Sequence, residues 1–168
     1  QFPETVQLEQ LSVGPLAMWR PNYPTPANIQ LGLRDGQVKL VARVKPFSET
    51  AHHHLDLEVN TLPLNSFSKL AQPMLTQLGG SLSARMTIEL QQQEKKTLAL
   101  KQQGELSLND LRLGFRGHRL SQQKLSWNGK VNMADLAKPE SLVVSGDLKL
   151  TRMALSPTRN NNPYLSLG

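Results

Sequence analysis

The chain has 168 residues, which fits one domain with a sizeable core, and it contains no cysteine, which excludes disulfides and thiolate metal sites. Its formal charge of +6 favours anionic partners, but its basic residues are spread out and only 5% of its residues are aromatic. We therefore expect solvated strand faces and no nucleic acid partner, because single-strand binders interleave aromatic and basic residues. No apolar run approaches the length of a membrane span.

A short pattern recurs along the chain: two apolar residues two positions apart, then a polar pair, then two more apolar residues two positions apart. Side chains alternate along a strand, so one extra residue, a β-bulge at the polar pair, would return all four apolar side chains to one face. The alternative is two short strands joined by a polar turn. The pattern occupies residues 6–13, 57–64, 106–113 and 148–155, and it predicts a degenerate repeat of roughly 40 to 50 residues.

The first connection runs from Pro15 to Pro26 and is too rich in proline for a central strand. We expect Trp19 and Tyr23 to pin this loop to the body.

Residues 29–44 predict the clearest hairpin, because Asp35-Gly36 suits a two-residue type I′ turn. That turn would place Leu33 opposite Val38. The apolar residues of both strands would then share one face of the sheet.

The next strand, residues 52–64, carries His52, His54, Asp56 and Glu58 on its outer face. Residues two apart on a strand could share a metal ion, and this is the one ligand-like cluster in the sequence. Four positions along one strand span too far to converge on a single ion. We expect a solvated polar face and no metal site.

Residues 66–78 change to helical spacing, with Phe67, Leu70, Met74 and Leu78 on one face. Pro73 lies too deep for the first helical turn, so the pattern predicts a kink or two short helical turns. We expect the apolar face to pack on the sheet. The alternative is a gate over a binding groove.

Alternation then resumes in segments 81–91, 97–113, 125–133 and 142–155, while 114–123 is predicted to be a polar excursion. The chain is therefore predicted to be a single domain, all-β with one short helical insertion. Antiparallel hairpins would build a long bent sheet. The sheet could remain an open or partly closed β-groove, or it could close into a sandwich.

Motifs for catalysis are missing from the sequence: it has no Gly-x-Ser-x-Gly, no phosphate-binding glycine loop and no His-Glu-x-x-His. The carboxylates are scattered on outward faces, without an apolar setting that would separate the pKa values of a pair. We expect no enzyme activity and no cofactor.

The order of several weak motifs resembles a known family. Leu62-Pro63-Leu64 ends an extended segment, a short helix with an internal proline follows, and the run from Leu78 to Arg85 opens a long alternating strand. Later units begin Gly-Glu-Leu-x-Leu-x-x-Leu-x-Leu and Gly-Asp-Leu-x-Leu-x-x-Met-x-Leu. Over residues 38–155 this resembles the AsmA-like superfamily of large Gram-negative envelope proteins, which carry repeating β-groove domains.

The resemblance implies a fragment of a periplasmic protein whose missing parts reach the inner membrane, with a role in lipid transport or outer-membrane maintenance. Its partner would be a phospholipid or other acyl lipid, and envelope proteins are possible further partners. The alternative function is a β-sandwich binding domain for carbohydrate or a protein. The residues expected to line the groove are Leu57, Val59, Leu62, Leu64, Phe67, Leu70, Met74, Leu106, Leu108, Leu111 and Leu113.

Overall fold

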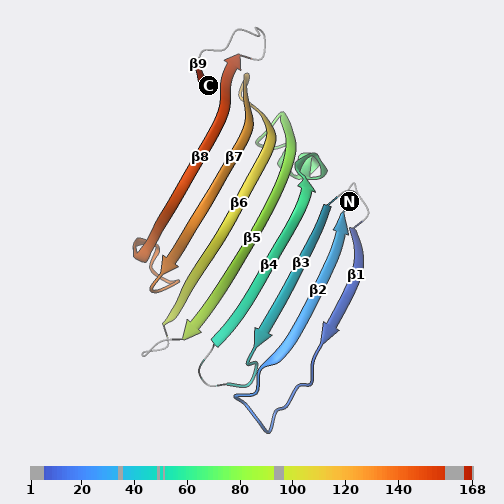
Figure 1. Cartoon of the computed structure of the whole chain (residues 1–168), viewed down its shortest axis with the longest axis vertical. Coiled ribbons are helices and arrows are strands. Elements are labelled where there is room, and N and C mark those ends of the chain that lie inside the picture. The colour runs from blue at the N-terminus through green and yellow to red at the C-terminus, as the bar shows by residue number, and fades with distance from the viewer. Residues whose placement is uncertain are drawn as a thin grey trace.

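The described residues form a single sheet of nine antiparallel strands in which every strand pairs with its neighbours in sequence (Figure 1). The computed structural model describes residues 6–33, 36–48, 50, 52–92, 97–157 and 165–167. The strands are β1 (Val6–Val13), β2 (Thr25–Leu33), β3 (Gly36–Val44), β4 (His52–Pro63), β5 (Gln77–Gln92), β6 (Leu98–Phe115), β7 (His118–Met133), β8 (Leu142–Pro157) and β9 (Leu165–Leu167). The helical turns are η1 (Leu64–Phe67), α1 (Ser68–Ala71) and η3 (Pro139–Ser141). The predicted fold class, all-β with one short helical insertion, is confirmed.

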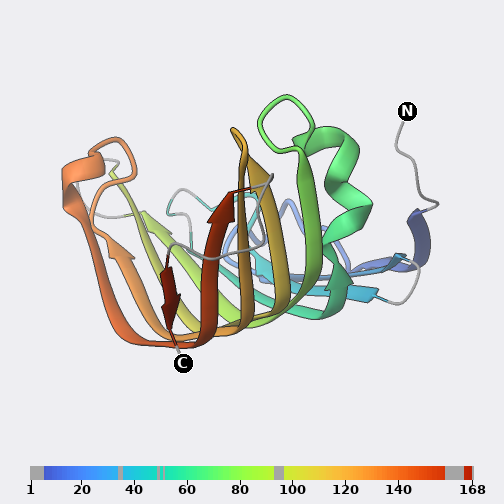
Figure 2. The same cartoon turned by 90° about the horizontal axis from the view of Figure 1, so that it is seen from above.

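The sheet is bent into a trough, and the bend lies within the strands themselves. Figure 2 shows β8 descending from one rim, crossing the floor and rising to the other rim. The axis of the trough therefore crosses the strands, and the connections between strands form its two rims. Because the sheet does not close on itself, the trough is open at the β1 edge and at the β8 edge.

One corner of the bend is a row of bulges in β6, β7 and β8. Asp110 and Arg152 both have a φ of 50°, the left-handed conformation. The register places Gln123 between them, so the three strands carry their extra residue in the same row and keep their pairing. The other two bulges lie in one strand of a pair only, so the register shifts there. β4 has an extra residue against β5 beside Thr61, whose φ is 49°, and β1 has one against β2 at Glu9. The bulges predicted from the repeated pattern are therefore present in all four repeats.

The other corner is a row of three glycines, Gly104, Gly129 and Gly146, which are paired across β6, β7 and β8. A Cβ on Gly104 would lie 2.1 Å from the carbonyl oxygen of Arg85, and one on Gly129 would lie 2.2 Å from that of Ser145. The backbones thus approach too closely for any side chain on this row. Glycines of this kind let a strand turn a corner, so each of these strands bends once at a glycine and once at a bulge.

The best-packed part of the molecule lies under the helical insertion. Leu33, Val59, Leu62 and Ala84 form a buried cluster, and Phe67 of η1 packs against it from above the sheet. This cluster joins β2, β4 and β5 at one end of the trough. Elsewhere the apolar face of the sheet has no second layer of described residues over it.

The helical segment is shorter than predicted, since it ends at Ala71 and does not continue to residue 78. The backbone N–H groups of Met74 and Leu75 both donate to the carbonyl of Ala71 and close the last turn. Pro73 has no N–H to offer a continuing helix, which would cost about 3 kcal/mol. Gly79 and Gly80, which follow the segment of helical spacing, lie inside β5.

The β2–β3 hairpin is shifted by two residues from the predicted register. Leu33 pairs with Gly36 and Leu31 pairs with Val38, while Arg34 and Asp35 fall outside the described residues. The face predicted for each side chain survives, because a shift of two residues preserves alternation. A glycine is needed at position 36 for a different reason. A Cβ added there would lie 2.9 Å from the Cα of Leu62 beside the β4 bulge, which is too close.

The polar excursion predicted for residues 114–123 is wrong. β6 continues to Phe115 and β7 begins at His118, joined by Arg116 and Gly117 with φ values of 46° and 80°. Two consecutive residues of positive φ are the signature of a tight type I′ hairpin turn. The polar residues of this stretch mostly occupy the outer face of two paired strands.

Replacing Gly104 with alanine should destabilise the protein by at least about 2 kcal/mol more than replacing Gly117 with alanine. Both glycines have positive φ, at 152° and 80°, so both substitutions strain the backbone, typically by about 1–3 kcal/mol. Only the methyl group introduced at position 104 would also collide with neighbouring backbone, because nothing lies within 4 Å of a Cβ added at position 117. Urea unfolding of both variants measures the difference, and equal losses would show that the glycine row does not control the bend.

Candidate functional site: an open apolar trough

The concave face is built from side chains brought together by the register of the strands. Its floor lies between the glycine and bulge corners, where Leu106 pairs with Trp127 and Ala84, and Leu108 pairs with Leu125 and Leu82. The rows continue into β8 through Leu148 and Leu150. Following the alternation and the bulges across β1–β8, no Asp, Glu, Lys or Arg of the described strands occupies the concave face.

Much of this apolar face is open to solvent. Toward its two edges the side chains are largely exposed, for example 59% for Leu8 on β1 and 58% for Leu148 on β8. In the centre, Leu106, Leu108 and Leu113 are half-buried. A continuous apolar surface of this kind is uncommon on a soluble protein and marks a place for a ligand or partner.

Most of the residues predicted to line the groove share this face. Leu57, Val59, Leu62, Leu106, Leu108, Leu111 and Leu113 belong to the concave rows of β4 and β6. Leu64 and Phe67 lie on η1, and Phe67 packs on the buried cluster. Leu70 and Met74 do not pack on the sheet as predicted: Leu70 lies within α1 and is 60% exposed, and Met74, beyond the end of the helix, is 76% exposed.

Gln122 is a polar side chain within the apolar rows, and it supports the bulge corner. It is only 3% exposed, and its Nε2 donates to the carbonyl oxygens of Lys124 at 2.8 Å and Thr151 at 2.6 Å. Bulges remove carbonyls from the regular ladder, and buried polar groups require partners. At the β4 bulge the hydroxyl of Ser83 has a comparable role and accepts from the N–H of Thr61 at 3.2 Å.

Two other polar side chains on the concave face have unpaired atoms. Gln102 Nε2 and His53 Nδ1 are buried and have no hydrogen-bond partner among the described residues. Both belong to the wall on the same side of the glycine row, where Gln102 pairs with Ile88 and Val131 and His53 pairs with Leu90. This wall therefore contains two buried nitrogen atoms whose hydrogen-bonding capacity is not used by the described residues.

Trp127 contributes the largest ring on the floor. A Cβ on Gly129 would lie 2.7 Å from its Cζ2, so the indole covers the gap beside the glycine on its own strand. An aromatic ring over a strand glycine restores packing where the glycine has no side chain. The alternation of residues 125–133 is consistent with Trp127 on the apolar face. The sequence analysis did not identify Gln102, Gln122 or His53, although their alternation with apolar residues would have revealed them.

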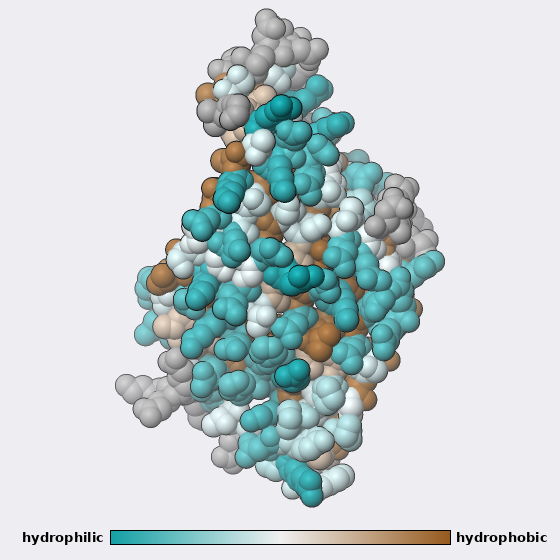
Figure 3. Space-filling view, in the orientation of Figure 1, coloured by the Kyte–Doolittle hydropathy of each residue, from teal (hydrophilic) through white to brown (hydrophobic). Residues whose placement is uncertain are grey.

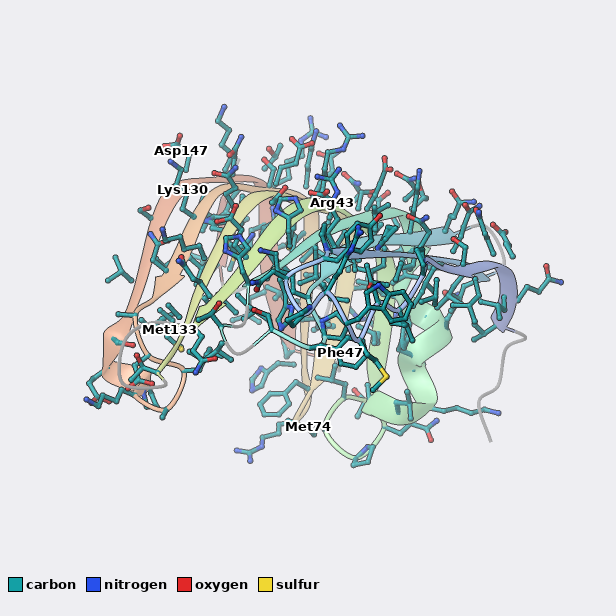
Figure 4. All side chains as sticks on the ribbon, turned by 90° about the horizontal axis from the view of Figure 1, so that it is seen from below. Arg43, Phe47, Met74, Lys130, Met133 and Asp147 are labelled. Carbon is teal, nitrogen blue, oxygen red and sulfur yellow. The ribbon has the colours of Figure 1, made fainter. Side chains whose placement is uncertain are left out.

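The convex face is polar, as the predominantly hydrophilic surface in Figure 3 shows. Arg43, Lys130 and Asp147 point away from the trough, while Met133 lies on its concave side (Figure 4). Arg85 Nη2 lies 2.9 Å from Glu58 Oε1, and this hydrogen bond and the guanidinium charge lower the pKa of Glu58. Because solvent reaches this pair, its contribution to stability is small. That contribution requires an ionised Glu58, so it is lost as the pH falls through the lowered pKa of Glu58.

His52 and His54 lie on this convex face, as predicted. His54 Nε2 is 3.2 Å from Asp56 Oδ2, and its Nδ1 is 3.7 Å from Glu89 Oε1. Among the described residues, no group of three or more potential metal ligands is arranged around a common point.

A hollow of about 420 Å³ also lies on the convex side, above Ser83, Ser107 and Ser126. Their short side chains leave room between charged neighbours of both signs, including Glu58, Arg85, Lys124 and Asp147. Mixed charges that can pair with each other and with water make this a solvated surface. The apolar trough is therefore the stronger candidate site.

Comparison with protein-family models, with curated protein sequences and with solved structures gave no match. No helix within the described ranges is long and apolar enough to cross a membrane.

Replacing Gln122 with leucine should lower the free energy of unfolding by about 1–3 kcal/mol, because two partly buried hydrogen bonds to backbone carbonyls would be lost. Replacing Gln102 with leucine is the matched control on the neighbouring strand, since its Nε2 has no partner to lose. We expect that variant to be as stable as the parent protein or more stable. Chemical denaturation of both measures this, and a greater loss for Gln102→Leu would contradict the assignment of the two side chains.

Proposed function

We propose that the protein is a non-enzymatic module whose trough holds the acyl chain of a phospholipid or related lipid. The observation that carries this proposal is the concave face itself, which is predominantly apolar and lacks charged side chains on the described strands β1–β8. An acyl chain needs a continuous apolar lining and no specific polar contact.

The dimensions of the trough agree with this cargo. Its axis crosses nine strands about 4.8 Å apart, which gives a length of roughly 40 Å. One leaflet of a bilayer has a hydrocarbon thickness of roughly 15 Å, half that of the hydrocarbon core. The trough is therefore long enough for a full acyl chain, and its open side leaves a headgroup free to remain in water.

The free energy available from such binding is considerable. Burying exposed apolar surface contributes about 25 cal/mol per Å², and full burial of one leucine or valine side chain contributes about 1.5–3 kcal/mol. Half-exposed side chains such as Leu106 and Leu108 would gain part of that amount from a ligand.

On the resemblance to AsmA-like proteins, we further propose that this module works in the periplasm, as part of an envelope protein that moves lipid between membranes. The trough supports that assignment because it supplies the surface such a protein requires. The alternative was a β-sandwich binding domain for carbohydrate or protein. The described strands form one sheet and not the two packed sheets of a sandwich. A protein strand or helix could still occupy the trough.

Replacing Leu108 with glutamate tests the proposal. Leu108 lies on the floor and is half-buried, so the fold should survive while a carboxylate interrupts the apolar lining. We expect affinity for a fluorescent phospholipid to fall about tenfold or more, since a buried unpaired charge costs well over 1.4 kcal/mol. Circular dichroism of the variant establishes that the sheet is intact.

The matched control is Ser107→Glu, which adds the same charge one residue away on the convex face. It should bind the phospholipid as well as the parent protein. Equal losses in the two variants, or a parent protein that binds no phospholipid, would contradict the proposed function.

A further inference from the structure

The loop between β1 and β2 presents large apolar side chains to solvent. Met18 and Trp19 are 71% and 79% exposed, and Leu16 and Tyr23 beside them are 56% and 44% exposed. Phe47 in the loop between β3 and β4 adds a further ring at 38% exposure. Trp19 was predicted to pin the loop to the body, and its exposure shows that it does not.

The loop is held in place by hydrogen bonds. The N–H of Arg20 donates to the carbonyl of Ala17 at 3.0 Å, so Met18 and Trp19 form the tip of a tight turn. A second turn follows at once, because the N–H of Tyr23 donates to the carbonyl of Arg20 at 2.8 Å. At the base, Thr25 is 2% exposed and its hydroxyl donates to the carbonyl of Pro15.

The two loops are also joined to each other. Ser48 Oγ donates to Asn22 Oδ1 at 2.9 Å, which ties the β3–β4 loop to the β1–β2 loop. Figure 1 places both at the lower end of the molecule, and Figure 4 shows Phe47 on the concave side of the sheet. The exposed rings therefore lie on one rim of the trough, near its β1 edge.

The charge around the loops is basic. Arg20 follows Trp19 directly, and Arg43 and Lys45 lie at the end of β3 next to the second loop. The sequence of the two loops holds one acidic residue, Glu49, which lies outside the described residues. Tryptophan and tyrosine flanked by arginine and lysine are the composition found where proteins meet the headgroup region of a bilayer.

We propose that the Met18–Trp19 turn inserts into the headgroup region of an anionic bilayer and holds this rim of the trough against the lipid surface. The exposed rings supply the apolar contact, and the three basic residues supply attraction to anionic headgroups. The fixed backbone of the turn reduces the entropy lost on insertion. Docking does not require the trough to carry lipid, so this inference and the proposed function can fail separately.

The absence of cysteine makes a clean test available. Met18→Cys and Met74→Cys each introduce a single thiol at a methionine that is about three-quarters exposed, one in the proposed turn and one at the helical rim. Each variant is labelled with an environment-sensitive fluorophore and mixed with vesicles of phosphatidylglycerol and phosphatidylcholine. We expect a blue shift and increased intensity for the label at position 18 and no change for the label at position 74.

Charge dependence is the second measurement. In the labelled Met18→Cys protein, Arg20→Gln and Lys45→Gln should each weaken vesicle binding about five-fold, which corresponds to about 1 kcal/mol for each basic residue near an anionic surface. Vesicles of phosphatidylcholine alone should bind much more weakly. The proposal is overturned if the label at position 18 does not respond, if both labels respond equally, or if affinity is the same on neutral vesicles.

The variant Trp19→Ser separates this inference from the lipid cargo. It should lose vesicle binding yet retain the affinity of the parent protein for a soluble short-chain fluorescent phospholipid in the trough. Vesicle binding that survives Trp19→Ser would contradict the docking role of the turn.

Discussion

The structure depends on bending the same strands twice without breaking their pairing. At the glycine row, neighbouring backbones lie too close for any side chain, and at the bulge row three adjacent strands each contain their extra residue in register. A bulge in one strand alone would shift the ladder beside it, as happens between β5 and β6 next to Gly80. Aligned bulges avoid that cost on β6, β7 and β8, so the strands curve together and the apolar side chains line the inside of the curve.

This geometry decides where polar groups can lie. Inside the bend, carbonyls released by the bulges have to be satisfied locally, and Gln122 does so with a side chain that reaches two strands. Outside the bend, side chains spread apart and meet water, so ion pairs such as Glu58–Arg85 are tolerated there. Among the described residues, the sheet therefore has one charged face and one face without charged side chains, and only the part under the helical insertion is covered by a second layer. The convex face meets water, while most of the concave face stays available.

The sequence predicted the parts of the fold that follow from local alternation. The bulges could be located because each polar pair displaces the apolar pattern by one residue, and the faces of β4 and β6 followed from the same count. Features that depend on contacts between strands could not be predicted. The β2–β3 register was wrong because Gly36 serves a close approach to Leu62 and not the turn, and no local pattern distinguishes these two uses of a glycine.

The candidate site was predicted in part for the same reason. The aliphatic lining follows from alternation, but the exposure of Met74 depends on where the helix ends, and the exposure of Trp19 depends on a turn held by hydrogen bonds. Proline-rich loops give no periodic signal from which the orientation of a side chain can be predicted. The row of glycines was visible in the sequence only as separate residues, because their alignment requires the register of three strands.

The central claim is that the concave face is an accessible apolar trough occupied by acyl lipid. Native mass spectrometry of the purified protein, followed by extraction and identification of whatever dissociates from it, tests this claim most directly. The account predicts a protein population that carries at least one acyl lipid, with the bound fraction strongly reduced in Leu108→Glu and unchanged in Ser107→Glu. A protein that carries no lipid, and acquires none after incubation with phospholipid, would contradict it.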